Sequence, residues 1–187
     1  MRIILVSLFL LFLTSCSLPF LKQDTHNLSY EEYKQALTKK TTKKFKLNGK
    51  LFLFVNQKGQ TGKILWSYQN NIDSINILSP FNTKVAEVSL NELEKRITLK
   101  FSKENSRNSE DLISKIFGSE ESVFLLKKFI TAPPKQLATS KHITIKYNKW
   151  DIIYQGNKII RGQLVPNTIE FKKNNISLKI FIVDWIL

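Results

Sequence analysis

From residue 44 onward, apolar and polar side chains alternate over long stretches, which is the pattern of β-strands that bury one face. The stretch 45–55 shows this alternation, although Phe52 and Phe54 make its far end apolar on both faces. Similar stretches follow at residues 64–68, 75–77, 86–90 and 97–101. The joins between them are short and polar, which is typical of hairpins. The pattern therefore predicts five consecutive antiparallel strands.

Helical spacing of the apolar residues replaces the alternation after a polar stretch. Two short amphipathic helices are predicted at residues 109–117 and 119–130, because a serine precedes each apolar run and glycine or proline follows it. A third helix is predicted from Ser29 to about Thr38, since Ser29 and Glu32 have the spacing of a capping box.

Alternation then resumes, and it predicts five more strands at residues 143–147, 151–154, 159–164, 169–171 and 177–185. The fold class is therefore mainly β with short helices. A sheet of about ten to eleven strands must curl. Helices that close one side of a curled sheet leave an apolar interior. We expect an incomplete antiparallel β-barrel that is covered by a lid of about three helices and encloses a hydrophobic cavity.

The N-terminal residues have the features of an export signal. Residues 3–13 are apolar except for Ser7 and follow Met1 and Arg2. At 1.5 Å per residue this run spans roughly 16 Å, which is too short to cross the ~30 Å hydrocarbon core of a bilayer. It therefore indicates the apolar region of a signal peptide.

The residues Leu13, Thr14, Ser15 and Cys16 resemble a bacterial lipobox, in which the cysteine becomes the lipid-modified N-terminus. The resemblance implies a signal peptide at 1–15, a lipidated tether at 16–28 and a folded domain at 29–187. Ser17, in place of aspartate, favours the outer over the inner membrane. The alternative is an ordinary secretory signal with a cysteine nearby by chance.

The charge of the chain suggests an anionic partner. The 187 residues include 29 Lys and Arg against 15 Asp and Glu, and the formal net charge is +14. A phospholipid surface or a nucleic acid would suit such a charge. However, a basic helix, a helix-turn-helix pattern and an aromatic RNA-binding strand are all missing from the sequence, and export argues against nucleic acid. The densest cluster, Lys39, Lys40, Lys43, Lys44 and Lys46, is either a solvated surface or a contact with lipid head groups.

The sequence offers little for catalysis or metal binding. Its two histidines, His26 and His142, do not suffice for a histidine-based triad or a histidine-rich metal site. The single cysteine excludes a disulfide scaffold and a zinc site of paired cysteines. The residues Gly59, Gly62 and Lys63 are too closely spaced for a phosphate-binding loop. We therefore expect no enzyme, no cofactor and no metal.

Several short segments, in this order, resemble the LolB family of outer-membrane lipoproteins. They are residues 45–49, 62–66, 75–80, 124–130, 150–154 and 178–185, together with Pro133, Pro166 and Ile169. Two positions depart from the family pattern. Phe129 stands where the family usually has Trp, and Phe81 with Asn82 stands where it usually has Leu-Gly.

The resemblance implies a lipid-anchored, monomeric receptor that faces the periplasm. Such a receptor accepts acylated lipoproteins from a LolA-type carrier in an apolar cavity and inserts them into the inner leaflet of the outer membrane without nucleotide. The residues expected to line that cavity, or else to form an ordinary packed core, are Leu51, Leu53, Ile64, Trp66, Ile75, Ile77, Val88, Leu99, Ile113, Ile116, Phe124 and Ile130.

Pro80 and Phe81 form the expected membrane insertion loop, because the matching family position is an exposed Leu on a protruding loop. The alternative is that Phe81 folds back onto the barrel end. Two other functions remain open for the whole chain. One is an envelope lipoprotein that binds or scaffolds without transport, and the other is a carrier of another hydrophobic ligand.

Overall fold

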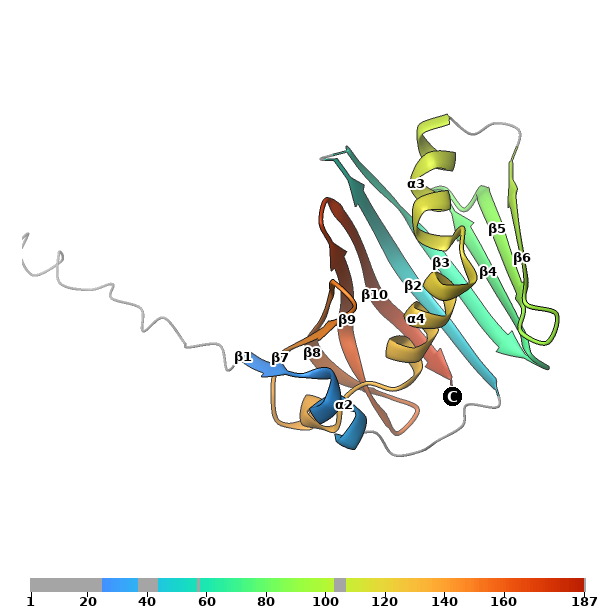
Figure 1. Cartoon of the computed structure of the whole chain (residues 1–187). Coiled ribbons are helices and arrows are strands. Elements are labelled where there is room, and N and C mark those ends of the chain that lie inside the picture. Colours follow the sequence, from blue (N-terminus) through green and yellow to red (C-terminus); the bar gives the residue numbers. More distant parts are fainter. Residues whose placement is uncertain (1–24, 37–43, 57, 103–106, 187) are drawn as a thin grey trace, which may run out of the picture.

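The computed structural model describes residues 25–36, 44–56, 58–102 and 107–186. Five antiparallel strands form a meander: β2 (Lys44–Val55), β3 (Lys58–Gln69), β4 (Ile72–Leu78), β5 (Lys84–Asn91) and β6 (Arg96–Phe101). They confirm the five strands that the alternation predicts. Two helices follow, α3 (Arg107–Phe117) and α4 (Glu120–Thr131), and the short 3-10 helix η2 (Lys135–Ala138) leads back to the sheet (Figure 1).

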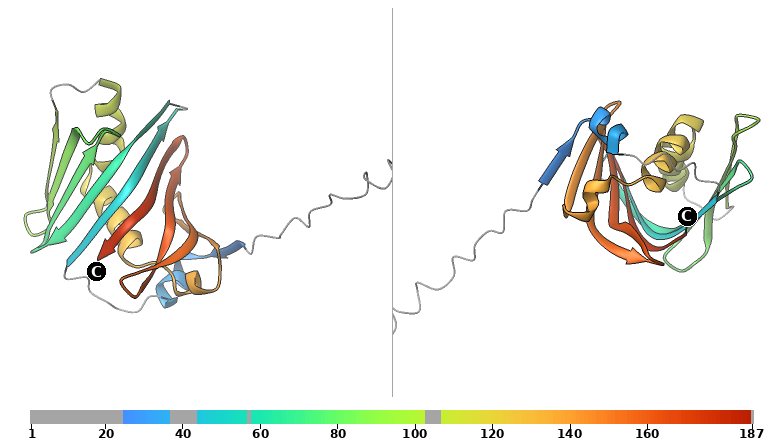
Figure 2. Two further views of the ribbon diagram at one scale, coloured as in Figure 1. Left: turned by 180° about the vertical axis from the view of Figure 1, so that it is seen from behind. Right: turned by 90° about the horizontal axis from the view of Figure 1, so that it is seen from below.

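The C-terminal half adds four strands, β7 (His142–Tyr147), β8 (Trp150–Ile160), β9 (Gln163–Lys173) and β10 (Ile176–Ile186). Strand β10 pairs with β2, so the two halves form one ten-stranded sheet in the order β1-β7-β8-β9-β10-β2-β3-β4-β5-β6. Its edge strands do not pair with each other, and the sheet curves around α4 (Figure 2). The expected incomplete barrel with a helical lid is confirmed.

Two features of the sheet differ from the sequence-based prediction. The residues from 151 to 171 form two long strands, not three short ones, and the turn between them lies at Arg161 and Gly162, which both have positive φ. Gly156 falls in the predicted join between the strands at 151–154 and 159–164, but with φ +60° it lies inside β8, close to the point where β8 stops pairing with β7. A glycine within a strand pattern often marks such a bend.

The second difference concerns residues 25–28, the end of the predicted tether. They form β1 (Thr25–Leu28), which pairs in parallel with β7. Helix α2 (Tyr30–Ala36) follows directly. Its capping box is present, since Ser29 N donates to Glu32 Oε2 at 2.7 Å and Glu32 N donates to Ser29 Oγ at 3.3 Å. The hydrogen bond from the Ser29 backbone lowers the pKa of Glu32.

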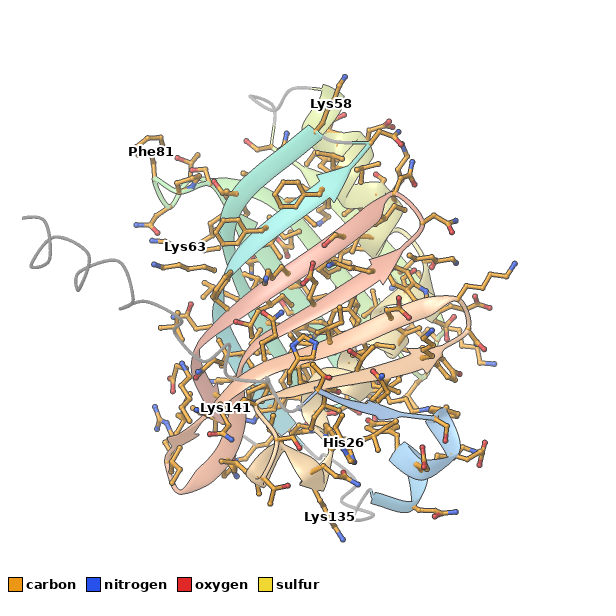
Figure 3. The ribbon with its side chains drawn as sticks, turned by 90° about the vertical axis from the view of Figure 1, so that its left-hand side faces the viewer. His26, Lys58, Lys63, Phe81, Lys135 and Lys141 are labelled. Carbon is orange, nitrogen blue, oxygen red and sulfur yellow. The ribbon has the colours of Figure 1, made fainter. Side chains whose placement is uncertain are left out.

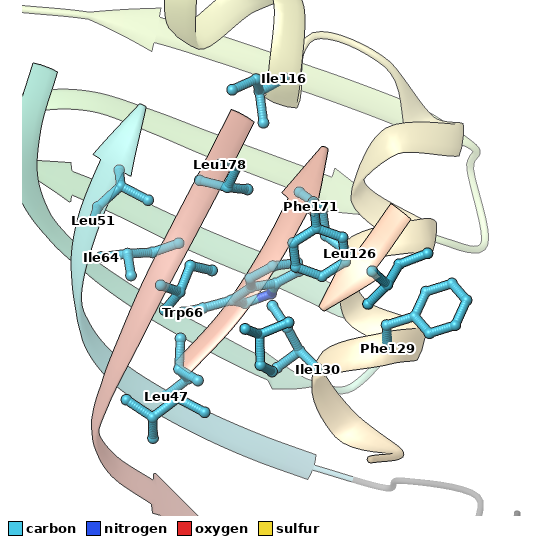
Figure 4. Close-up of a cluster of buried hydrophobic side chains, with 14 of the residues drawn as sticks. Leu47, Leu51, Ile64, Trp66, Ile116, Leu126, Phe129, Ile130, Phe171 and Leu178 are labelled. Carbon is cyan, nitrogen blue, oxygen red and sulfur yellow. The ribbon is translucent and has the colours of Figure 1, made fainter. Parts of the chain in front are cut away.

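The core lies between the concave side of the sheet and the helices. Every second residue of β2 is buried, as are the apolar residues of α3 and α4 that face the sheet. Figure 4 shows Ile130 of α4 and Trp66 of β3 among the side chains of this core. Within the described ranges, no helix is long and apolar enough to cross a bilayer.

Candidate functional site

The twelve residues predicted to line a cavity all lie in the space between sheet and helices. Ten of them are at most 4% exposed, while Leu99 and Phe124 are half-buried against the same core. The strand register explains why the sheet residues of this set share a face, because Trp66, Ile75 and Val88 stand opposite one another on β3, β4 and β5. The residues therefore share one apolar surface.

The structure shows a small void at this surface. A void of about 30 Å³ lies below α3, and Leu51, Leu53, Ile77 and Ile113 are among the residues that line it. This volume corresponds to about one water molecule. Around this void, the residues of the surface pack with α3 and α4 in one hydrophobic core.

A polar cluster, which we call the latch, joins α4 to the sheet. Asp73 on β4 is fully buried and accepts hydrogen bonds from Trp66 Nε1 at 2.8 Å and from Lys127 Nζ of α4 at 2.7 Å. Lys127 also donates to Glu92, and the Tyr68 hydroxyl donates to Glu92 at 3.0 Å. The latch therefore links the lid to strands β3 and β4 and to the turn after β5.

Burial raises the pKa values of two side chains in the latch. It raises the pKa of Asp73 above its ordinary value, although the hydrogen bonds from Lys127 and Trp66 act in the opposite direction. Burial also raises the pKa of Tyr68 to about 12. A buried carboxylate is costly unless it is paired and hydrogen-bonded. Each oxygen of the Asp73 carboxylate accepts one hydrogen bond, from Trp66 or from Lys127.

Other polar contacts of α4 also gather in its second half. The Tyr154 hydroxyl donates to the Phe129 carbonyl and the Tyr33 hydroxyl to the Ala132 carbonyl, both at 2.8 Å. These carbonyls lie at the helix end, where no backbone partner is available. Helix α3, in contrast, faces the sheet with apolar residues, among them Ile113 and Phe117. The lid is thus held by polar contacts at one end and by apolar packing at the other.

Sequence reasoning missed the latch. It placed Lys127 among the residues of an amphipathic helix and did not single out Asp73. A signal was available, because Asp73 lies two residues before Ile75 and four before Ile77, and the alternation therefore points it inward. A charged residue at an inward position calls for a partner.

Two pockets flank α4 on the surface. The larger, of about 570 Å³, lies between α4 and the turns that follow β7 and β9. The other, of about 340 Å³, lies on the latch side and includes Tyr68, Glu92 and Lys127. Phe124 and Lys128 line both pockets. The two pockets lie at the solvent-facing margins of the lid.

Among the large apolar residues that the structure describes, Phe81 is the most exposed, at 89%. It lies in the turn between β4 and β5 (Figure 3). This turn is well ordered by hydrogen bonds: Ser79 N donates to the Thr83 carbonyl at 2.8 Å, and Ser79 Oγ accepts from the backbone N–H groups of Phe81 and Thr83, both at 3.2 Å. Phe81 therefore projects from a defined loop. Cys16 and the lysines at 39, 40 and 43 lie outside the described residues.

No three His, Cys, Asp or Glu side chains in the described part of the chain gather where they could hold a metal ion. The site consists instead of an apolar surface, the helices that cover it and an exposed aromatic loop.

Comparison with known proteins agrees with this geometry. Residues 43–185 match the family described as "Outer membrane lipoprotein LolB". The chain is also 26% identical to the outer-membrane lipoprotein LolB of Tolumonas auensis, and the match covers 94% of this chain and 92% of that protein. The resemblance seen in the sequence is confirmed, and the chain belongs to the LolB family of outer-membrane lipoproteins.

Proposed function

We propose that this protein accepts acylated lipoproteins from a LolA-type carrier, holds their acyl chains between lid and sheet, and inserts them into the inner leaflet of the outer membrane without nucleotide. The observation that carries the proposal is the apolar concave surface beneath a helical lid. Among the described residues, the polar contacts that hold this lid to the rest of the protein come from the second half of α4. A packed core of this kind can exchange its lid contacts for contacts with acyl chains.

The physical need for such a surface follows from the cargo. Exposing an acyl chain to water costs about 0.8 kcal/mol per methylene, hence on the order of 10 kcal/mol per chain. A lipoprotein in transit therefore needs an apolar enclosure. We propose that α3 and the first half of α4 swing outward to provide it, because the latch and the two tyrosine hydrogen bonds hold only the second half of α4.

Phe81 supports the release step of the proposal. A fully exposed aromatic side chain is unusual unless it meets an apolar partner. The acyl region of a bilayer is such a partner. We propose that Phe81, presented with Pro80 on the ordered turn, enters the membrane and guides the cargo into it.

Binding of a fluorescent fatty acid to the protein without residues 1–16 tests whether the enclosure opens. Every described strand and helix is retained in this truncated protein, since β1 begins at Thr25. We expect saturable binding whose affinity increases steeply with chain length, by up to about fourfold per methylene. A dye-matched probe with a butyryl chain serves as the control. A protein that only scaffolds would bind neither probe, and this outcome would refute the enclosure.

A further inference from the structure

One row of residues crosses the convex side of the sheet and ends at the Phe81 turn. Phe181 of β10 stands opposite Lys50 of β2, Lys50 opposite Lys63 of β3, and Lys63 opposite Leu78 of β4. Leu78 directly precedes the turn, and Lys63 Nζ donates to Asn82 Oδ1 within the turn at 2.5 Å. Lys63 and Phe81 lie together at one edge of this face in Figure 3.

The pair formed by Lys50 and Lys63 is unfavourable for folding. Side chains that stand opposite each other on neighbouring strands are about 5 Å apart at Cβ, and two like charges there are destabilising. No carboxylate of the described residues forms an ion pair with either lysine. The nearby carboxylates are already engaged: Glu170 pairs with two other lysines, and Asp184 pairs with Arg161. The charge of the two lysines is therefore available to an external anion.

Aromatic side chains lie beside these lysines. Phe52, next to Lys50 on the same face of β2, packs edge-on against Phe181 with ring centroids 5.3 Å apart. Leu65 and Phe181 are about two-fifths exposed, at 40% and 39%. The outward positions of β2, β3 and β4 include no carboxylate. We call Lys46, Lys50, Phe52, Lys63, Leu65 and Phe181 the basic convex face.

We propose that the basic convex face docks on the anionic phospholipid headgroups of the membrane. Charge complementarity favours this occupant, because lysines attract anionic headgroups while exposed aromatic rings settle at the headgroup boundary. The row of residues leads directly into the Phe81 turn, so docking would bring Phe81 against the bilayer. The proposal rests on the proposed function for the role of Phe81, but not for the lipid contact itself.

The test is sedimentation of the protein without residues 1–16, in the absence of cargo, with two kinds of vesicle. One kind consists of phosphatidylcholine alone and the other also contains phosphatidylglycerol. We expect binding only to the anionic vesicles, and we expect added salt to weaken it. Each lysine near such a surface contributes about a fivefold factor, so the variant with Lys50→Gln and Lys63→Gln should bind about 25-fold more weakly.

The matched control is the variant with Lys135→Gln and Lys141→Gln, which loses the same charge. Both lysines are exposed, and both lie far from Phe81 in Figure 3. We expect the control to bind like the parent protein. If both double variants lose vesicle binding equally, the loss reflects the change in net charge alone, and the proposal is overturned. Because the like-charged pair opposes folding, Lys50→Gln should leave Tm unchanged or raise it, which separates the loss of binding from unfolding.

The two proposals can fail separately. If the parent protein binds acyl probes in solution but not the anionic vesicles, the basic convex face is not a membrane contact and the receptor function stands. If the double variant keeps its vesicle binding but no longer receives cargo from the carrier, the face binds the carrier protein, and the lipid assignment is wrong.

Discussion

Replacing Phe81 by glutamate is expected to block the release of cargo into membranes while leaving the fold intact. The side chain is 89% exposed, so its loss removes almost no packing, and the free energy of unfolding should change by less than about 0.5 kcal/mol. Burial of a phenylalanine in an apolar phase is worth about 1.5–3 kcal/mol, which corresponds to a loss of ten- to hundred-fold in membrane engagement. A carboxylate adds the cost of burying a charge. Transfer of a loaded lipoprotein to vesicles measures this effect.

Leu93→Glu is the matched control for this experiment. Leu93 is 79% exposed and lies in the turn at the opposite end of β5, so it offers a similar apolar surface away from Phe81. We expect Leu93→Glu to transfer cargo normally, and Phe81→Leu to retain most of the activity because it preserves an apolar tip. Normal insertion by Phe81→Glu would refute the role of this loop in release.

Replacing Lys127 by methionine is expected to destabilise the folded protein by about 3–5 kcal/mol at neutral pH, because it leaves the buried Asp73 carboxylate without its counter-ion. The effect should depend on pH. Burial raises the pKa of Asp73, and loss of Lys127 raises it further. A carboxyl group with a raised pKa in the folded state favours folding while it is protonated. Its contribution to the free energy of unfolding is therefore present at acid pH and is lost as the pH increases through the raised pKa. The difference in Tm from the parent protein should therefore shrink as the pH falls toward the ordinary range of a carboxyl group.

Asp73→Asn in the Lys127→Met background is the control. The amide oxygen still accepts the hydrogen bond from Trp66 Nε1, and the fully buried charge is removed. The half-buried Glu92 keeps its hydrogen bond from the Tyr68 hydroxyl. We expect this double variant to regain most of the lost stability and to lose the pH dependence. A Lys127→Met protein with the stability of the parent at neutral pH would mean that the latch does not hold the lid.

The sequence predicted the fold well where one signal dominates. The alternation on β2 and the capping box at Ser29 and Glu32 both appear as expected. Gly156 misled the prediction, because a glycine in a strand pattern is compatible with a turn or with a bend, and only the pairing of β8 with β9 distinguishes them. Residues 25–28 fall in the predicted tether, because four residues give too short a pattern to reveal their pairing with the distant strand β7.

One part of the candidate site, its apolar surface, was predictable from the alternation along the strands. Alternation identifies which side of a strand is apolar, and the twelve predicted residues accordingly lie in or against one hydrophobic core. It does not indicate whether the space between them is filled, because packing depends on the positions of the helices. The latch also depends on a contact between residues 54 positions apart, Asp73 and Lys127. The exposure of Phe81, by contrast, agrees with its position after Pro80 in a short turn.

Transfer from a loaded carrier tests the receptor function most directly. The protein without its signal and anchor is mixed with a LolA-type carrier that holds a triacylated lipoprotein, and no nucleotide is added. We expect the cargo to move to this protein and to be recovered with it after separation. Cargo that stays on the carrier, although circular dichroism shows a folded β-protein, would contradict the account.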